Sequence, residues 1–151
     1  MKRFQYLIDK EYGYIPNILT KSQTTPKITL GRIKIVNDLT SYSKFGCERW
    51  IIPKCIMDGS DEIKYRFIRG FFDGDVTQSN NGFVIYSANK DSLFNLYELL
   101  ESLNILSTFR GPYKRKGRKN MYEIYVRACS RERFITLIDP IKYKPASHSF
   151  R

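Results

Sequence analysis

Residues 67–75 have the sequence FIRGFFDGD, the most informative stretch of this chain. Apolar residues between Ile63 and Phe72 recur at helical spacing, so we expect a helix with one broad apolar face. Glycine inside a helix costs about 1 kcal/mol relative to alanine, and Gly70 stands inside this one. A second helix packed closely across Gly70 and Gly74 is the simplest compensation for that cost.

The predicted helix ends in carboxylates. Asp73 and Asp75 lie in its last turn, where negative charge opposes the helix dipole by roughly 0.3–1 kcal/mol. A cation is a sensible missing partner for this charge. Taken without their flanks, however, the residues Asp-Gly-Asp favour a plain helix stop that turns into a strand.

From residue 60 onward the sequence predicts helix–strand–strand–helix–strand–strand–helix, an α+β arrangement. Ser60 and Ser130 are the expected N-caps of the first and last helices, and Asn80-Asn81-Gly82 favours a tight hairpin turn. The expected elements are a helix over 61–74, strands from 76 and over 83–87, a helix over 91–103, strands over 105–113 and 121–128, and a helix over 130–138.

The first part of the chain has a shorter pattern, helix–strand–strand–helix. Its helices are expected over 1–12 and 33–42, closed by Gly13 and Gly46, and the hairpin between them turns near Thr25-Pro26. This order matches the later part of the longer unit, so a truncated repeat is indicated.

Four segments follow from this pattern. They are a partial, degenerate copy over 1–46, a connector over 47–60, a complete copy over 61–142 and a tail over 143–151.

Composition favours a globular protein with a polyanionic partner. The 151 residues suffice for one domain, or for one domain and part of another. A formal net charge of +11 exceeds what solubility requires, and counterion release from phosphates is the usual physical reason for such a bias. Charge alone does not establish nucleic acid as the partner.

Several function classes find no support in the sequence. Cys47, Cys55 and Cys129 form no closely spaced pair and His148 is the only histidine, so a zinc site is not indicated. We expect these thiols to be buried or half-buried in a reducing cytoplasm. No apolar run approaches the ~20 residues of a membrane span, and the start, MKRFQYLIDKEYG, lacks the features of a signal peptide. An intracellular protein without a membrane partner is therefore expected.

Residues 68–76, IRGFFDGDV, resemble the LAGLIDADG motif. Residues 52–56, IPKCI, look like the connector that often precedes this motif in dodecapeptide-type homing endonucleases. The resemblance covers most of the chain from about residue 28. It implies the α+β homing-endonuclease fold with a saddle-shaped antiparallel sheet. Val76 departs from the usual small last residue of the motif.

The resemblance also implies roles for the motif residues. Two such helices pack side by side in the family, so Gly70 and Gly74 would supply the close contact and Asp73 would be a structural or interface residue. Asp75 would be the metal ligand, and Mg²⁺ or another divalent cation suits its hard oxygens. Site-specific cleavage of double-stranded DNA is the implied activity.

The helix over 1–12 has two interpretations. It resembles faintly a decayed motif with Glu11 in the acid position, but Tyr6 and Lys10 stand where small residues are expected. We favour the later helix of a lost half. The chain then has one motif, and an active cleft needs a homodimer or a complementary LAGLIDADG subunit.

The resemblance places DNA contacts on the strands and the second hairpin. We call the lysine- and arginine-rich loop between the strands over 105–113 and 121–128 the basic loop, and a solvated charged turn is the alternative interpretation of it. The family pattern would place two further arginines, Arg127 and Arg32, near the cleavage centre. Surface charge at a strand end is an equally plausible interpretation of both. The proposed DNA-binding residues are Thr77, Gln78, Asn80, Arg110, Tyr113, Lys114, Arg115, Lys116, Arg118 and Lys119.

The sequence leaves three classes of function open. The first is a metal-dependent endonuclease. The second is a non-catalytic nucleic-acid-binding remnant or a maturase-like RNA-binding protein that helps intron splicing. The third is a DNA-binding regulator that uses the same fold. The nuclease alone requires Asp75.

Overall fold

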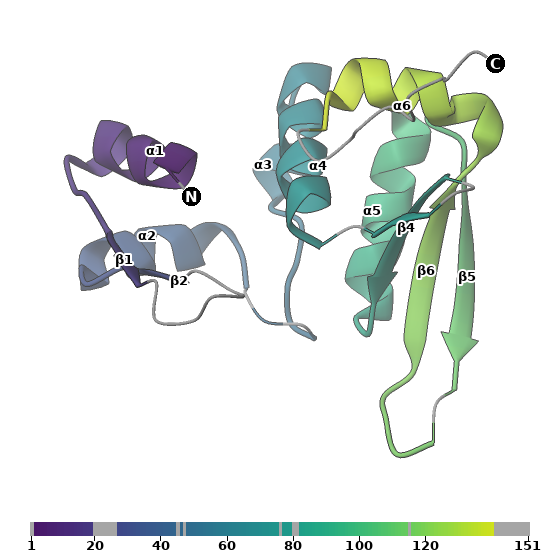
Figure 1. The fold of residues 1–151 in the computed structure, drawn as a ribbon, viewed down its shortest axis with the longest axis horizontal. Coiled ribbons are helices and arrows are strands. Elements are labelled where there is room, and N and C mark those ends of the chain that lie inside the picture. Colours follow the sequence, from purple (N-terminus) through teal and green to yellow (C-terminus); the bar gives the residue numbers. More distant parts are fainter. Residues whose placement is uncertain are drawn as a thin grey trace, which may run out of the picture. The chain divides into compact units, whose positions relative to one another are not determined.

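The computed structural model describes residues 2–19, 27–44, 46, 48–75, 77–79, 82–114 and 116–140. The chain divides into two compact units, an N-terminal unit over residues 1–43 and a C-terminal unit over residues 44–151 (Figure 1).

The N-terminal unit is a hairpin flanked by two helices, in the predicted order. Its strands pair antiparallel, with Asn17 opposite Thr29. The hairpin turn expected near Thr25-Pro26 lies outside the described residues. The elements are α1 (Lys2–Tyr12), β1 (Asn17–Leu19), β2 (Lys27–Thr29) and α2 (Ile33–Tyr42).

Both helix ends in this unit have a local cause. Gly13 adopts φ +58° and its N–H donates to the Asp9 carbonyl at 2.7 Å, so it ends α1 as expected. α2 ends at Tyr42, as predicted, but its C-cap is the extended Ser43 and not Gly46. A hydrogen bond from the Tyr12 hydroxyl to Asp38 Oδ2, at 2.5 Å, joins α1 to α2.

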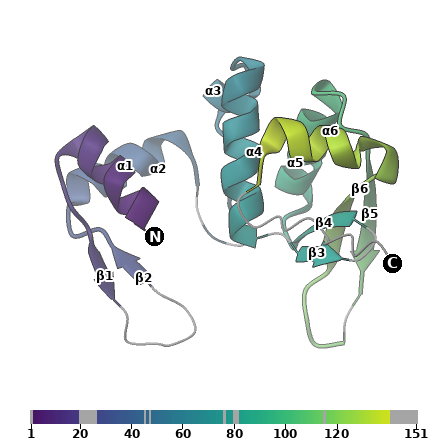
Figure 2. The same cartoon turned by 45° about the horizontal axis from the view of Figure 1, so that its top comes forward.

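The C-terminal unit contains the predicted helix–strand–strand–helix–strand–strand–helix order. Figure 2 shows the short strand β3 beside β4. The elements are α3 (Lys54–Met57), α4 (Asp61–Asp75), β3 (Thr77–Ser79), β4 (Gly82–Ser87), α5 (Lys90–Ser102), β5 (Ser107–Tyr113), β6 (Met121–Val126), the 3-10 turn η1 (Ala128–Ser130) and α6 (Arg131–Ile138).

The four strands form one antiparallel sheet in the order β3-β4-β6-β5. Val84 lies opposite Tyr125, and Phe109 opposite Ile124. The register between β5 and β6 shifts between Arg110 and Tyr113. The expected tight turn at Asn80-Asn81 lies outside the described residues, although Ser79 does pair with Gly82.

Three local predictions differ from the structure. The connector contains the short helix α3, which begins directly after Pro53. Ser130 does precede α6, but its hydroxyl accepts from the Leu106 N–H at 2.9 Å and so anchors the start of β5. Cys55 and Cys129 are exposed free thiols, so the expectation of buried or half-buried cysteines was wrong for both.

One core lies between the helices and one face of the sheet. Its centre is formed by Phe72, Phe83 and Phe134, which we call the Phe72 triangle. The ring centroid of Phe72 lies 5.0 Å from those of both Phe83 and Phe134, and the last two are 4.9 Å apart. Ile68 of α4 is 1% exposed, whereas Ile63 at the start of that helix is 43% exposed. The phenylalanines therefore fix the C-terminal part of α4 against β4 and α6.

The connector is fastened to the start of α5. Asn89 caps this helix by accepting from the Ser92 N–H at 3.2 Å, and its side-chain amide donates to the Trp50 carbonyl at 2.9 Å. The Ser92 hydroxyl donates to the same carbonyl. Ile52, two residues after Trp50 in the connector, is buried in the core. These contacts set where the chain enters α3 and α4.

Among the described residues, no helix has the length and apolar character needed to cross a membrane.

Candidate functional site

The acidic end of α4 is positioned by the core. Phe72 is 3% exposed, and Asp75, three residues later, is the last residue of the helix. The first turn of α4 contains Asp61 and Glu62, which suit the positive end of the helix dipole, but its last turn contains no basic residue. The last turn of α4 thus places acidic residues at the negative end of the helix dipole. The side chain of Asp75 lies outside the described part of the structure.

Gly70 and Gly74 are exposed on α4. A Cβ atom added at either glycine would meet no described atom within 4 Å, so there is open space over this strip of the helix. The predicted close contact is therefore not supplied by the core of the C-terminal unit. Whether a second helix covers the strip stays a prediction, and so does the interface role of the half-buried Asp73.

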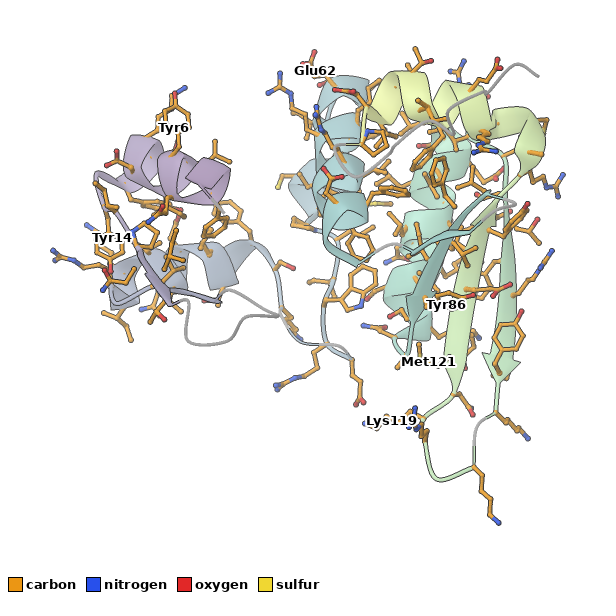
Figure 3. All side chains as sticks on the ribbon, in the orientation of Figure 1. Tyr6, Tyr14, Glu62, Tyr86, Lys119 and Met121 are labelled. Carbon is orange, nitrogen blue, oxygen red and sulfur yellow. The ribbon has the colours of Figure 1, made fainter. Side chains whose placement is uncertain are left out.

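The second face of the sheet carries polar and aromatic side chains. Side chains alternate along a strand, and Phe83, Ile85 and Ile124 occupy the core face. Two rows of cross-strand neighbours point the other way, and they are Val84–Tyr125–Thr108 and Tyr86–Glu123–Arg110. We call this surface the open face. Figure 3 shows Tyr86 and Met121 along these strands.

Glu123 lies at the centre of the open face and was not among the residues predicted from the sequence. It is 9% exposed, and its Oε1 lies 3.4 Å from Nη1 of Arg110. Burial, and next the interaction with the Glu123 carboxylate, raise the pKa of the Tyr113 hydroxyl. The alternation of side chains along the strands could have revealed Glu123, because it is the one acidic residue within the four strands of the sheet.

The basic loop connects β5 to β6. Four of its predicted DNA-binding residues are exposed, and they are Lys114, Lys116, Arg118 and Lys119. The Lys119 ammonium is paired with Glu48, which ties the basic loop to the connector. Figure 3 labels Lys119 on this loop. Arg115 and Asn80 lie outside the described residues, as do the side chains of Thr77 and Gln78.

The two arginines predicted near the cleavage centre belong to different units. Arg127 is exposed directly after β6, and its Nε donates to the Thr108 hydroxyl of the open face at 3.3 Å. Arg32 is exposed directly before α2, with its guanidinium carbon 5.6 Å from the centre of the Tyr14 ring. A centre shared by Arg32, Arg127 and Asp75 stays a prediction.

No cluster of three or more Asp, Glu, His or Cys side chains able to hold a metal ion occurs among the described residues. The last residue of α4 is a single carboxylate, Asp75. Mg²⁺ is commonly held by one or two carboxylates together with substrate phosphates and water. The donor chemistry therefore fits a hard divalent cation only if a second carboxylate and phosphate oxygens join Asp75.

The fold and the motif identify the family. The family model of the LAGLIDADG-like domain matches residues 62–139, more than half of the chain. No curated protein matches this sequence.

Solved structures of the homing endonuclease I-DmoI share the fold. A structure of its mesophilic variants gives a TM-score of 0.69 at 18% identity and covers 90% of this chain and 69% of that chain. The complex of I-DmoI with DNA and Mn gives 0.63 at 18%, covering 89% and 69%. The complex with DNA and Ca gives 0.66 at 16%, covering 89% and 64%. With its α+β fold and its matching motif, this chain belongs to the LAGLIDADG family.

Proposed function

We propose that this protein is a metal-dependent endonuclease that cleaves a specific site in double-stranded DNA. One observation carries the proposal: α4, whose acidic last turn has no basic residue, leads after one residue into the sheet that carries the open face. A polyanion on that face would bring phosphates towards Asp75.

The proposed role of Asp75 is to hold a divalent cation, for which Mg²⁺ is the first choice. Such an ion, when bound, polarises a phosphate and lowers the pKa of an attacking water. The chain's own contribution is rigid placement, because the Phe72 triangle fixes the helix end one turn before Asp75. The I-DmoI complexes contain Mn, Mg or Ca with DNA, which supports a divalent cation here.

A second carboxylate has to come from another motif helix. We propose that this helix packs across Gly70 and Gly74, where added side chains would find open space. Asp73 would face that contact. A homodimer or a complementary LAGLIDADG subunit can supply the helix, because the sequence of this chain contains one complete motif.

Residues 1–46 are, in this proposal, the remaining part of a degenerate half. Residues 47–60 connect it to the complete half over 61–142, and 143–151 form a tail. The helix–strand–strand–helix order of the N-terminal unit supports this assignment.

We propose double-stranded DNA as the partner of the open face. The net charge of +11 and the exposed lysines and arginines of the β5–β6 loop supply phosphate contacts. Arg110, Tyr113 and the polar residues of β3 are of the type that contacts base edges. Arg127, beside Thr108 on the open face, is the proposed basic residue nearest the cleavage centre, with Arg32 as its counterpart.

A non-catalytic nucleic-acid-binding protein, including a maturase-like RNA-binding protein, is the second candidate. The single complete motif favours it, since one helix end cannot supply both carboxylates. This candidate needs the charged surface but tolerates replacement of Asp75.

The deciding experiment compares Asp75→Asn with Asp61→Asn, which removes the same charge at the opposite end of α4. A duplex site is first enriched by binding from a fully randomised library, and cleavage of that site is then assayed with Mg²⁺. We expect Asp75→Asn to bind the site as wild type does and to cleave it below detection, while Asp61→Asn cleaves normally. Equal cleavage by wild type and Asp75→Asn would refute the nuclease assignment. Specific binding without cleavage by wild type would favour the second candidate.

A further inference from the structure

A buried carboxylate is unexpected on a surface that binds a polyanion. Glu123 is 9% exposed at the middle of the open face, between Tyr86 on β4 and Arg110 on β5. No other strand residue of the sheet is acidic. A carboxylate there repels phosphates and partly neutralises the nearest arginine, so its presence calls for a compensating role.

Two side chains of β6, Glu123 and Tyr125, lie next to the guanidinium of Arg110. Nη1 of Arg110 lies 3.4 Å from Glu123 Oε1, and its guanidinium carbon lies 5.4 Å from the centre of the Tyr125 ring. Tyr125 follows Glu123 by two residues on β6 and therefore lies on the same face. Arg110 is thus held by a carboxylate and by an aromatic ring from the neighbouring strand.

The pair is asymmetric in its exposure. The Arg110 side chain is 53% exposed, whereas the Glu123 side chain is 11% exposed. Burial, and next the Glu123 carboxylate, raise the pKa of the Tyr113 hydroxyl on the same strand as Arg110. The arginine is consequently the accessible member, and the carboxylate is the enclosed anchor that limits where the arginine can point.

We propose that Glu123 is a positioning residue that orients Arg110 to recognise a guanine in the major groove. This inference rests on the proposed DNA-binding function of the open face. Arginine has five N–H donors in a planar fork, so a contact to Glu123 leaves donors for the O6 and N7 acceptors of guanine. Fixing the fork beforehand reduces the side-chain entropy lost when the base is bound.

The test compares the base preferences of wild type and three variants. Wild type, Glu123→Gln, Arg110→Gln and the double variant each select binding sites from a fully randomised duplex library, and the enriched sequences are aligned position by position. Glu98→Gln is the matched control, because it removes the same charge from an exposed site on α5, the helix that covers the core face. Thermal melting of each variant checks that the fold is kept.

The inference predicts a loss of preference at one guanine. Arg110→Gln abolishes that preference, and Glu123→Gln lowers it about tenfold at the same position while the other positions keep theirs. The double variant resembles Arg110→Gln alone. Glu98→Gln leaves the selected sequence unchanged. If Glu123→Gln does not fold, a guanine preference that survives Arg110→Gln still refutes the inference.

Other results overturn the inference in distinguishable ways. Unchanged preferences in Glu123→Gln would leave Glu123 as a structural cross-strand partner. A change at a cytosine, away from the position that responds to Arg110→Gln, would mean that the carboxylate reads a base directly. If wild type enriches no sequence and binds no duplex, both the DNA-binding function and this inference fail.

Discussion

The two units of this chain differ in how much apolar surface they enclose. Among the described residues, the C-terminal unit buries an extended cluster with many side chains at 0–2% exposure, whereas Ile8 and Ile35, each 5% exposed, are the buried hydrophobics of the N-terminal unit. Leu7 and Ile33 are 51% and 78% exposed, and Tyr6 projects from the outer side of α1 (Figure 3). The hydrophobic effect can therefore stabilise one unit far more than the other.

This difference matters for function. The complete motif, the open face and the basic loop all belong to the unit with the large core. A site that must hold a carboxylate in a fixed position requires rigid support around it, and the Phe72 triangle supplies this for α4. The N-terminal unit has no comparable cluster among its described residues, which accords with the proposal that it is the remnant of a larger half.

The largest expected effect comes from separating the units. A fragment of residues 44–151 should melt cooperatively, because it contains the whole core cluster. A fragment of residues 1–43 should show no cooperative unfolding, because chains below about 40–60 residues rarely bury enough apolar surface alone. Circular dichroism during urea titration measures both. Cooperative unfolding of the short fragment would break the comparison.

The second-largest difference between the units should come from shortening one buried isoleucine in each of them. Ile124 is 0% exposed under the helices of the C-terminal unit, so Ile124→Ala should reduce the free energy of unfolding by about 3–5 kcal/mol. Ile35→Ala should cost about 2 kcal/mol or less, because its thin surroundings can collapse around the smaller side chain. Urea unfolding of each full-length variant tests this. Equal losses would mean that the N-terminal unit packs more tightly than its burial suggests.

Helix caps offer a smaller contrast. Asn89→Ala removes the cap of α5 and the bond to the Trp50 carbonyl, so we expect a loss of about 1–2 kcal/mol. In the described part of α2, the N-cap Arg32 makes no side-chain cap bond. Arg32→Ala should therefore change the free energy of unfolding by about 0.5 kcal/mol or less. Chemical denaturation resolves the two, and Asn95→Ala on the exposed surface of α5 is a control.

The smallest expected effect is on a proton equilibrium. The hydrogen bond to Asp38, supported by burial and the Asp38 charge, raises the pKa of Tyr12 from 10.0 to about 12. Neutral Tyr12 thus favours the folded N-terminal unit. Because the folded pKa is the higher one, this contribution is complete below pH 10 and disappears as the pH rises towards 12.

Asp38→Asn should return the pKa of Tyr12 towards 10. Ultraviolet titration of wild type and of Asp38→Asn measures it, with Tyr12→Phe in each background to isolate one tyrosine. An unchanged titration curve would show that the contact between α1 and α2 does not persist in solution.

The spacing of apolar residues predicted the helices and strands well, because this spacing follows the period of each element and can be read along the sequence. The spacing of Ile68 and Phe72 placed α4, and the leucines of α5 are buried as their spacing requires. Pairing between strands is different, since it depends on register. Arg110 lies directly opposite Glu123, and the register shift at Gly111-Pro112 puts Tyr113, opposite Met121, on the same face. Glycine and proline inside a strand mark where pairing becomes irregular, but not which side chains then meet.

The roles of single residues were less accessible to sequence reasoning. Ser130 was expected to cap α6, but the Leu106 N–H in a distant segment competes for its hydroxyl. Asp75 was identified through resemblance to a family, because the residues Asp-Gly-Asp alone favour a turn. Its chemistry depends on a partner carboxylate and a phosphate, which the sequence of one chain does not contain.

Localised radical cleavage would test the metal-binding role of Asp75 most directly. The protein, bound to its selected duplex, is given Fe²⁺ in place of Mg²⁺ together with hydrogen peroxide and ascorbate. The peroxide is reduced at the iron to hydroxyl radicals, which cut the nearest polypeptide backbone, and ascorbate returns the iron to Fe²⁺. We predict polypeptide cuts beside residue 75 in wild type and their loss in Asp75→Asn. Cuts that persist in Asp75→Asn, or that fall elsewhere in wild type, would contradict the account.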